Sequence, residues 1–306
     1  MRKAGSGRGL RLAAVQMCSG PSVEKNLEKA LGLISQGAEL GADLIALPEN
    51  FALMGSDRQR AEVAQGLDGP ILTELRRTAR RHAVAVLAGT FPESCRAGGD
   101  RRPYNTSVLI GRRGEIAAVY RKLHLFDVSL PDGTSYEESR HIRPGSDLVT
   151  ARFGTIGLGL TICYDLRFPE LYRALALRGA QVIIVPSAFT LLTGKDHWIP
   201  LLRARAIENQ VYVVAPAQFG THESGRQTYG HSAIVDPWGT VIAQASDQEC
   251  VIRADLDPAF QEDVRRRIPV FDHLRTRAFE QALAAAKEVR AKANGKRQRA
   301  KGRGKR

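Results

Sequence analysis

The chain has 306 residues, carries a net charge of +13, and is 43% hydrophobic and 25% charged, which is ordinary for a globular protein with one large core. Its N-terminus lacks the apolar segment of a secretory signal and no later stretch is long and apolar enough to cross a membrane, so we expect no membrane partner. The four cysteines are too widely spaced for a disulfide framework or a zinc site, which predicts reduced thiols and a cytoplasmic protein.

Apolar, β-branched runs recur along the chain and predict a core rich in strands. Helical patterns lie between several of them: one follows the potential cap Ser22 and reaches Ala38, a second begins near Pro70, and others cover 170–177 and 200–209. Strands that alternate with helices indicate an α/β protein. The predicted strands are 12–17, 44–47, 84–90, 106–110, 116–120, 156–162, 182–185, 211–215, 232–235 and 251–254.

Glu49 follows the apolar strand 44–47 and the proline that ends it, so we expect its carboxyl to be half-buried. Burial raises the pKa of a carboxyl, which would make Glu49 a better general base toward a thiol than a solvated glutamate. The alternative is a solvated residue at the end of a strand.

Arg121 and Lys122 interrupt a strand-like stretch between apolar neighbours, and one of them is expected to point inward. An ammonium held near a reacting carbonyl would stabilise the developing oxyanion. The pattern alone does not choose Lys122 over Arg121, and the alternation of Lys122 with His124 is also typical of the wet face of a strand.

Cys163 ends the predicted buried strand 156–162 and precedes a polar segment. The strand would fix the position of the thiol, and the turn after it would expose the sulfur and free nearby backbone N–H groups, as an attacking group requires. The alternative is a buried structural cysteine, because free cysteine is among the most buried residue types.

The end of the chain is charged. After about Phe260 we expect a charged helix with an apolar stripe of Phe279, Leu283 and Ala286, which runs into a tail, 291–306, with eight Lys and Arg and no acid. Such a tail cannot bury enough apolar surface to fold. It is either a solubilising disordered extension or a tether to nucleic acid or a membrane surface, so a nucleic-acid-binding or scaffold protein is the alternative of another class. Residues 1–10 are expected to be flexible.

The contexts of Glu49, Lys122 and Cys163 together resemble the nitrilase-like carbon–nitrogen hydrolases, whose signature is a Glu, Lys and Cys triad. The resemblance runs from 11 to about 257, within a predicted domain of 11–290. It implies a four-layer α-β-β-α sandwich, a homodimer or larger homo-oligomer, and an amidase without a cofactor. The seven histidines do not cluster at ligand spacings, so we expect no metal. The segments that carry the resemblance are Leu47-Pro48-Glu49-Asn50, Tyr120-Arg121-Lys122-Leu123-His124-Leu125-Phe126 and Cys163-Tyr164-Asp165-Leu166-Arg167-Phe168-Pro169-Glu170.

Within this resemblance, Cys163 is the nucleophile that forms a thioester, Glu49 the base and Lys122 the oxyanion stabiliser. The backbone N–H of Tyr164 is implied as a second oxyanion donor. Glu138 matches a further family glutamate that supports the lysine, with Glu137 as its rival in register.

Several downstream segments look like the Nit branch of the family and are most similar to its deaminated glutathione amidases, which implies release of 2-oxoglutarate and cysteinylglycine. Arg167 is implied to bind the acyl carboxylate, with an ion pair to Asp165 or Glu170 as its structural alternative. Phe189 and Thr190 match the loop that covers the acyl chain. The segments are Pro186-Ser187-Ala188-Phe189-Thr190, Thr193-Gly194, His197-Trp198, Leu202-Arg203-Ala204-Arg205-Ala206-Ile207-Glu208, Tyr229-Gly230-His231-Ser232 and Val235-Asp236-Pro237-Trp238-Gly239.

The choice of substrate has alternatives. An ω-amidase acting on 2-oxoglutaramate and an N-carbamoyl amide hydrolase fit the same triad, and two segments depart from the branch pattern: the charged pair Lys195-Asp196 and the polar stretch 220–226. His231 is interpreted as a buried, hydrogen-bonded histidine at a strand start, because Glu49 already supplies the base.

Overall fold

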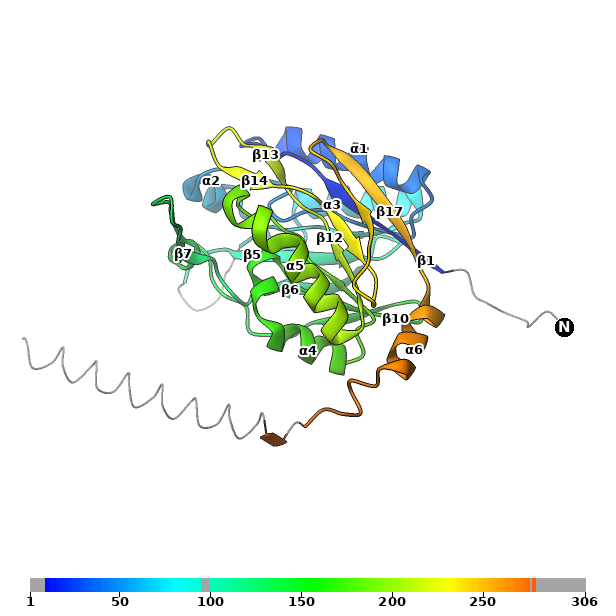
Figure 1. The fold of residues 1–306 in the computed structure, drawn as a ribbon. Helices are drawn as coiled ribbons and strands as arrows, with labels where there is room; N and C mark the ends of the chain where they lie inside the picture. Colours follow the sequence, from blue (N-terminus) through cyan, green and yellow to red (C-terminus); the bar gives the residue numbers. More distant parts are fainter. Residues whose placement is uncertain (1–8, 95–99, 276, 279–306) are drawn as a thin grey trace, which may run out of the picture. The chain divides into compact units, whose positions relative to one another are not determined.

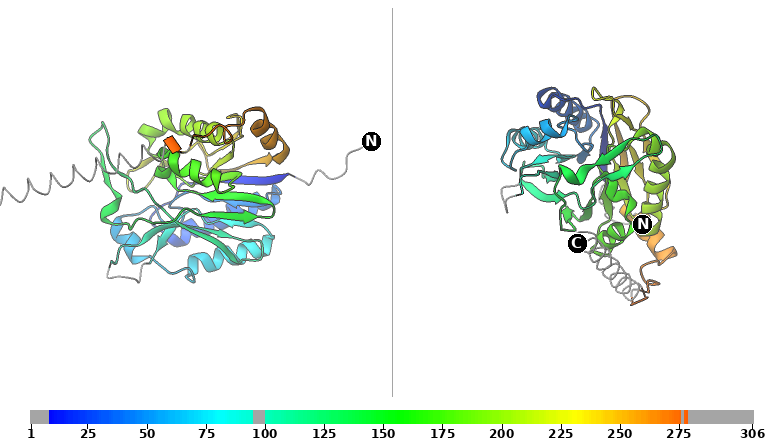
Figure 2. Two further views of the ribbon diagram at one scale, coloured as in Figure 1. Left: turned by 90° about the horizontal axis from the view of Figure 1, so that it is seen from below. Right: turned by 90° about the vertical axis from the view of Figure 1, so that its left-hand side faces the viewer.

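The computed structural model of the protein describes residues 9–94, 100–275 and 277–278. The chain divides into two units after Val264. In the first unit, two β-sheets face each other, with helices on the outer side of each sheet (Figure 1; Figure 2). These are the four layers, α-β-β-α, of the predicted α/β sandwich.

The first sheet has seven strands in the order β17-β1-β2-β3-β5-β4, with β6 also paired to β5. Its centre, β1-β2-β3, is parallel, and β17, β5, β4 and β6 are each antiparallel to their neighbours. The strands are β1 (Leu10–Gln16), β2 (Leu44–Ala46), β3 (Ala85–Leu87), β4 (Phe91–Glu93), β5 (Tyr104–Ile110), β6 (Ile116–Arg121) and β17 (Cys250–Leu256).

The second sheet has six strands in the order β16-β15-β12-β11-β10-β9. Its centre, β10-β11-β12, is parallel, and the strands outside it are antiparallel. The strands are β9 (Thr150–Phe153), β10 (Ile156–Leu160), β11 (Val182–Ile184), β12 (Tyr212–Ala215), β15 (Ala233–Val235) and β16 (Val241–Gln244). Two hairpins stand apart: β7 (Asp127–Ser129) with β8 (Ser135–Glu137), and β13 (Phe219–Thr221) with β14 (Gln227–Tyr229).

The helices bury the outer faces of the sheets. Helices α1 and α3 contact the first sheet, and α4 and α5 contact the second. Helix α1 begins after Ser22, whose side chain accepts a hydrogen bond from the N–H of Lys25, as predicted. The helices are α1 (Val23–Glu39), α2 (Asp57–Glu62), α3 (Pro70–His82), α4 (Pro169–Leu177), α5 (Leu191–Asn209) and α6 (Pro258–Arg267), and the 3₁₀ turns are η1 (Glu138–Arg140) and η2 (Cys163–Arg167).

All ten predicted strands are confirmed. Most of them are covered on both faces, and such strands are continuous apolar runs that are easily read. The short or half-exposed strands β4, β7, β8, β9, β13, β14 and β16 and the short helix α2 were not predicted. The predicted start of α5 at Pro200 is wrong: the helix begins at Leu191 and Pro200 lies inside it. The stripe of Phe279, Leu283 and Ala286 and the tail lie outside the described residues, so the expected boundary at 290 stays a prediction.

Strand direction brings the predicted site residues to one edge of the molecule. Strands β2 and β3 are parallel, β5 runs against β3, and β6 runs against β5, so β6 points the same way as β2. Glu49 after β2 and Lys122 after β6 therefore lie at the same edge as Asn105 near the start of β5. In the second sheet, Cys163 and Ala188 follow the carboxyl ends of β10 and β11.

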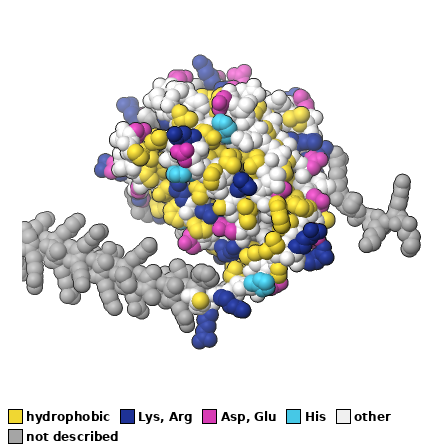
Figure 3. Space-filling view, viewed as in Figure 1, with side chains coloured by type: hydrophobic (Ala, Val, Ile, Leu, Met, Phe, Trp, Pro, Cys, Tyr) yellow, Lys and Arg dark blue, Asp and Glu magenta, His cyan; other side chains and the backbone are white. Residues whose placement is uncertain are grey.

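No helix among the described residues is long and apolar enough to cross a membrane. On the face drawn in Figure 3, Lys and Arg side chains are interspersed with Asp and Glu. In the sequence, residues 291–306 contribute eight of the 13 net positive charges.

Candidate active site

Cys163 is held at a sharp turn. It is the first residue of η2, its backbone φ is +47°, and its N–H donates to the backbone oxygen of Pro186 at 2.9 Å. An L-residue persists in this left-handed region only where its surroundings hold it there. The turn places the thiol, only 7% exposed, against the carboxylate of Glu49.

Asp165 ties this turn to the end of β6 and was missed as a support by sequence reasoning. Its carboxylate is fully buried and accepts hydrogen bonds from the N–H of Ile162 at 2.9 Å and the hydroxyl of Tyr120 at 2.6 Å. The N–H of His124 also donates to it at 3.1 Å, and the His124 ring nitrogen Nδ1 lies 2.7 Å away. The nucleophile turn and the strand that carries Lys122 are therefore one connected unit.

Glu49 is more deeply buried than expected, with 2% of its surface exposed. Its Oε1 accepts hydrogen bonds from Lys122 Nζ and Asn105 Nδ2, both at 2.9 Å, and its Oε2 accepts one from the N–H of Ala188 at 3.0 Å. Neither Asn105 nor Ala188 was predicted. A strand residue and a backbone N–H carry no distinctive pattern in the sequence.

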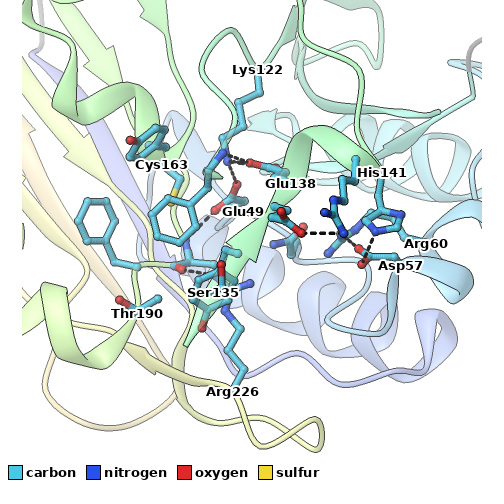
Figure 4. A pocket seen from close by; sticks show the side chains of 18 of the residues that line it. Glu49, Asp57, Arg60, Lys122, Ser135, Glu138, His141, Cys163, Thr190 and Arg226 are labelled. Atoms are coloured by element: carbon cyan, nitrogen blue, oxygen red, sulfur yellow. Dashed lines mark hydrogen bonds and ion pairs between the residues drawn. The ribbon is translucent and has the colours of Figure 1, made fainter. Parts of the chain in front are cut away.

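Lys122, and not Arg121, points inward. Lys122 is 2% exposed, and its Nζ lies 2.9 Å from Glu49 Oε1 and 2.9 Å from Glu138 Oε2 (Figure 4). Arg121 instead pairs with Glu93, with Nη2 2.6 Å from Oε1. Of the two candidate glutamates, Glu138 contacts Lys122, whereas Glu137 is exposed and pairs with Arg140.

The expected rise in the pKa of Glu49 is wrong. Burial does raise the pKa of this carboxyl, but the ammonium of Lys122 and the hydrogen bonds from Lys122 and Cys163 outweigh it, so the pKa is lowered. Burial lowers the pKa of Lys122, but the negative charges of Glu138 and Glu49 raise it by more, so the pKa is raised overall. Glu49 therefore stays ionised and Lys122 stays charged.

The pKa of the Cys163 thiol, in contrast, is shifted so that the neutral form is favoured. Burial raises its pKa, and the Glu49 carboxylate raises it further, against the lowering effect of Lys122. A protonated thiol beside an ionised carboxylate is a nucleophile with an adjacent base, and the Lys122 ammonium is available to an oxyanion. The first N–H groups of a helical turn have no partner within the turn. In η2, the N–H groups of Cys163 and Asp165 donate to the backbone oxygens of Pro186 and Ile162, which leaves the N–H of Tyr164 without a backbone acceptor among the described residues.

The cluster lines a cavity of about 350 Å³, and every predicted site residue contributes to its wall: Glu49, Lys122, Glu138, Cys163, Tyr164, Arg167, Phe189 and Thr190. Arg167 is not engaged by Asp165 or Glu170. Its Nη1 lies 3.2 Å from His197 Nδ1, and its guanidinium lies 5.2 Å from the centre of the Phe189 ring. Among the described residues, no carboxylate forms an ion pair with it.

Some residues that the sequence analysis singled out lie at the margin of this cavity or outside it. Lys195 lines a neighbouring cavity, where Arg226 from the polar stretch 220–226 lies on the wall of both. His231 is hydrogen-bonded before a strand, with Nδ1 2.9 Å from the backbone oxygen of Tyr229, but it is partly exposed rather than buried. It does not line the catalytic cavity, so its ring is not part of this cluster.

The family model for carbon-nitrogen hydrolases matches residues 11–266. The chain belongs to this family. As a carbon–nitrogen hydrolase it is an enzyme that acts on carbon–nitrogen bonds other than peptide bonds.

Relatives of this hydrolase include the deaminated glutathione amidase of Synechocystis sp., which is 45% identical over 265 residues, or 85% of this chain and 96% of that protein. Among solved structures, the NitFhit protein of Caenorhabditis elegans has a TM-score of 0.83 and 39% identity and covers 90% of this chain and 67% of its own. Nit3 of Saccharomyces cerevisiae, a member of branch 10 of the nitrilase superfamily, has a TM-score of 0.79 and 32% identity, with 88% and 98% covered. The hydrolase thus has the relatives that its Nit-branch segments predict.

Proposed function

We propose that this carbon–nitrogen hydrolase is an amidase that converts deaminated glutathione to 2-oxoglutarate and cysteinylglycine through a thioester on Cys163. The observation that carries the proposal is the buried cluster of Glu49, Lys122 and Cys163 at the wall of a single cavity. The 45% identity to a deaminated glutathione amidase supports the choice of substrate.

In the first half of the reaction, Glu49 takes the proton of the Cys163 thiol as the sulfur attacks the amide carbon. The tetrahedral oxyanion is stabilised by the Lys122 ammonium and the N–H of Tyr164. The carbon–nitrogen bond then breaks, Glu49 returns the proton to the leaving nitrogen, and the free amine departs. The acyl group remains as a thioester on Cys163.

In the second half, Glu49 takes a proton from water, whose oxygen attacks the thioester carbon. The same two donors stabilise the second oxyanion, the carbon–sulfur bond breaks, and the thiol recovers its proton from Glu49. Glu138 holds Lys122 in place and keeps it charged. The cycle consumes one water and uses only side chains of the chain itself.

Arg167 is the cation we assign to the carboxylate of the acyl group. A guanidinium can bind a carboxylate through two parallel hydrogen bonds, and that of Arg167 has no carboxylate partner among the described residues. Phe189, 6% exposed, and Thr190 lie on the same cavity wall and would cover the acyl chain.

The test is hydrolysis of deaminated glutathione and 2-oxoglutaramate side by side, with Cys163→Ala as the blank. We expect a large kcat/KM preference for deaminated glutathione. A preference for 2-oxoglutaramate with release of ammonia would instead identify an ω-amidase. Hydrolysis of N-carbamoyl compounds, with release of carbon dioxide and ammonia, would replace both substrates.

We also propose a homodimer or larger homo-oligomer, as the family resemblance implies. The wide spacing of the four cysteines in the sequence supports a cytoplasmic location. The tail would make weak, salt-dependent contacts with nucleic acid beside catalysis. Sedimentation of the full chain at varied concentration tests the first point.

A further inference from the structure

Among the described residues, five Lys and Arg side chains line the catalytic cavity, and carboxylates of the protein pair with three of them. The paired cations are Arg60 with Asp57 (2.9 Å), Arg140 with Glu137 (2.9 Å), and Lys122 with Glu49 and Glu138 (2.9 Å each). The other two, Arg167 and Arg226, form no ion pair with a carboxylate of the described residues.

Arg226 is held in place by neutral groups and forms no ion pair with a carboxylate of the described residues. Its Nη2 donates to the backbone oxygen of Ala188 at 2.9 Å, and its guanidinium lies 5.2 Å from the centre of the Tyr136 ring. Its Nε is buried and has no hydrogen-bond partner among the described residues. A partly buried guanidinium in this state gains most from a carboxylate ligand, which forms charge-assisted hydrogen bonds with it.

Arg226 lies on the Glu49 side of the cavity. Ala188 connects the two, since its oxygen accepts from Arg226 and its N–H donates to Glu49 Oε2 at 3.0 Å. Burial raises the pKa of Glu49, and Lys122 lowers it. The positive charge of Arg226 adds a smaller lowering of the same pKa. Glu49 protonates the departing nitrogen in the proposed reaction, so the amine half of the substrate lies on this side, next to Arg226.

A second cavity, of about 630 Å³, continues from this point and shares Tyr136, Thr190 and Arg226 with the first. Its wall includes the exposed Leu191 and Leu192 at the start of α5, and Lys195. Figure 4 shows Arg226 beside Thr190 and below the cluster of Glu49 and Lys122. An extended leaving group therefore has room beyond the reacting carbon, in a cavity that begins at a guanidinium with no carboxylate partner among the described residues.

We propose that Arg226 binds a carboxylate on the leaving amine, so that the site selects amides with one carboxylate on the acyl half and another on the amine half. This rests on the proposed function and deepens it, because Arg167 then takes the acyl carboxylate and Arg226 the C-terminal carboxylate of cysteinylglycine. A substrate that loses only ammonia leaves Arg226 without a partner. The segment 220–226, which departs from the branch pattern, thus contributes a specificity-determining residue.

The experiment compares two ligands that differ only at the far end of the leaving group: 2-oxoglutaryl-cysteinylglycine and its C-terminal amide. Their Kd values are measured by calorimetry on full-length Cys163→Ala, which cannot turn them over. We expect the carboxylate form to bind about tenfold to a hundredfold more tightly, as charge-assisted hydrogen bonds provide. Adding Arg226→Gln should bring the two Kd values within about twofold, and Arg226→Lys, which keeps the charge but not the fork, should give an intermediate ratio.

Arg140→Gln is the matched control, because it removes the same charge from the same cavity at a residue already paired with Glu137. It should keep the full Kd ratio. Equal Kd values on Cys163→Ala, or a ratio that survives Arg226→Gln, would overturn the role of Arg226. Failure of the proposed function is separate: it is seen as absent turnover of the carboxylate form by the unmodified enzyme, whatever the Kd ratio.

Discussion

Lys122 is a buried cation between two carboxylates, and this position determines the resting protonation of the site. Its raised pKa keeps it an ammonium throughout the ordinary pH range. Glu49 remains a carboxylate because the same ammonium lowers its pKa against the effect of burial. We infer that Lys122 acts as a fixed charge, and that the proton that moves during the reaction is the one on the Cys163 thiol.

Removing the thiol should abolish turnover while leaving the fold intact. Cys163→Ala deletes one sulfur from a site whose Glu49, Lys122 and Glu138 contacts do not require it. We expect kcat/KM to fall more than a hundredfold, with an unchanged melting temperature within a few degrees. Cys18→Ala, at a thiol that does not line the catalytic cavity, is the control. Residual activity above about one percent, which corresponds to less than ~2.7 kcal/mol of barrier, would argue against covalent catalysis by Cys163.

The raised pKa of Cys163 predicts a pH dependence of stability. An unfolded cysteine ionises near pH ~8.5, whereas the folded thiol keeps its proton well above that value. The unfolded state therefore loses a proton first as pH rises. The stability contribution of this group is complete below pH ~8.5 and is lost progressively toward the folded pKa, by up to about 1.4 kcal/mol per pH unit.

Urea unfolding of the unmodified protein and Cys163→Ala between pH 7 and 10 measures this directly. The difference between their free energies of unfolding should be constant below pH ~8 and should fall with pH above ~8.5. Lys and Tyr titrations elsewhere cancel in the difference. Parallel profiles across the whole range would show that the thiol is not held protonated by the fold.

At the scale of the elements, the site is built where strands end, and one glycine permits the closest approach. Gly89 follows β3 with φ +21°, and a Cβ there would collide with the backbone oxygen of Pro48, the residue before Glu49. The loops after β2 and β3 can therefore lie against each other only if position 89 has no side chain.

Gly89→Ala should displace Glu49 and lower both stability and kcat. The added methyl meets backbone, which cannot move aside as a flexible side chain does, so we expect a loss of more than ~2 kcal/mol in the free energy of unfolding. Gly32→Ala is the control: it lies in α1 with open space around it and should stabilise the helix by about 0.5–1 kcal/mol. A Gly89→Ala protein with the stability and kcat of the unmodified enzyme would show that this close approach is dispensable.

The sequence predicts those parts of the site that lie at the ends of apolar runs. Glu49 and Cys163 each follow a strand whose continuous apolar residues mark it as buried, and these strands were confirmed. Asn105, in β5, and the N–H of Ala188 could not be predicted, because they gain their roles only when segments far apart in the sequence pack against Glu49. The sign of the Glu49 pKa shift was missed for the same reason, since its main opposing cause is an ammonium 73 residues away in sequence.

At the scale of the whole molecule, each sheet supplies half of the chemistry. The first contributes Glu49, Lys122 and Asn105, and the second contributes Cys163 and Ala188. The hydrogen bond from Ala188 to Glu49 joins the two halves. The base and the nucleophile therefore meet only when the two sheets are packed together, so activity reports on the sandwich as a unit.

Deleting residues after Asn294 tests whether the basic tail is separate from this unit. The deletion removes seven Lys and Arg and no acid, while every residue of the catalytic cavity precedes Val264. We expect kcat/KM for the amide substrate to be unchanged and retention on heparin or duplex DNA to fall steeply, because such binding comes from phosphate or sulfate neutralisation and counterion release. The full chain should elute from the column at a higher salt concentration than the truncated chain. Equal elution of the two chains would place the polyanion contact on the folded body and remove the tether hypothesis, whereas a loss of amidase activity would show that the tail acts on the catalytic cavity.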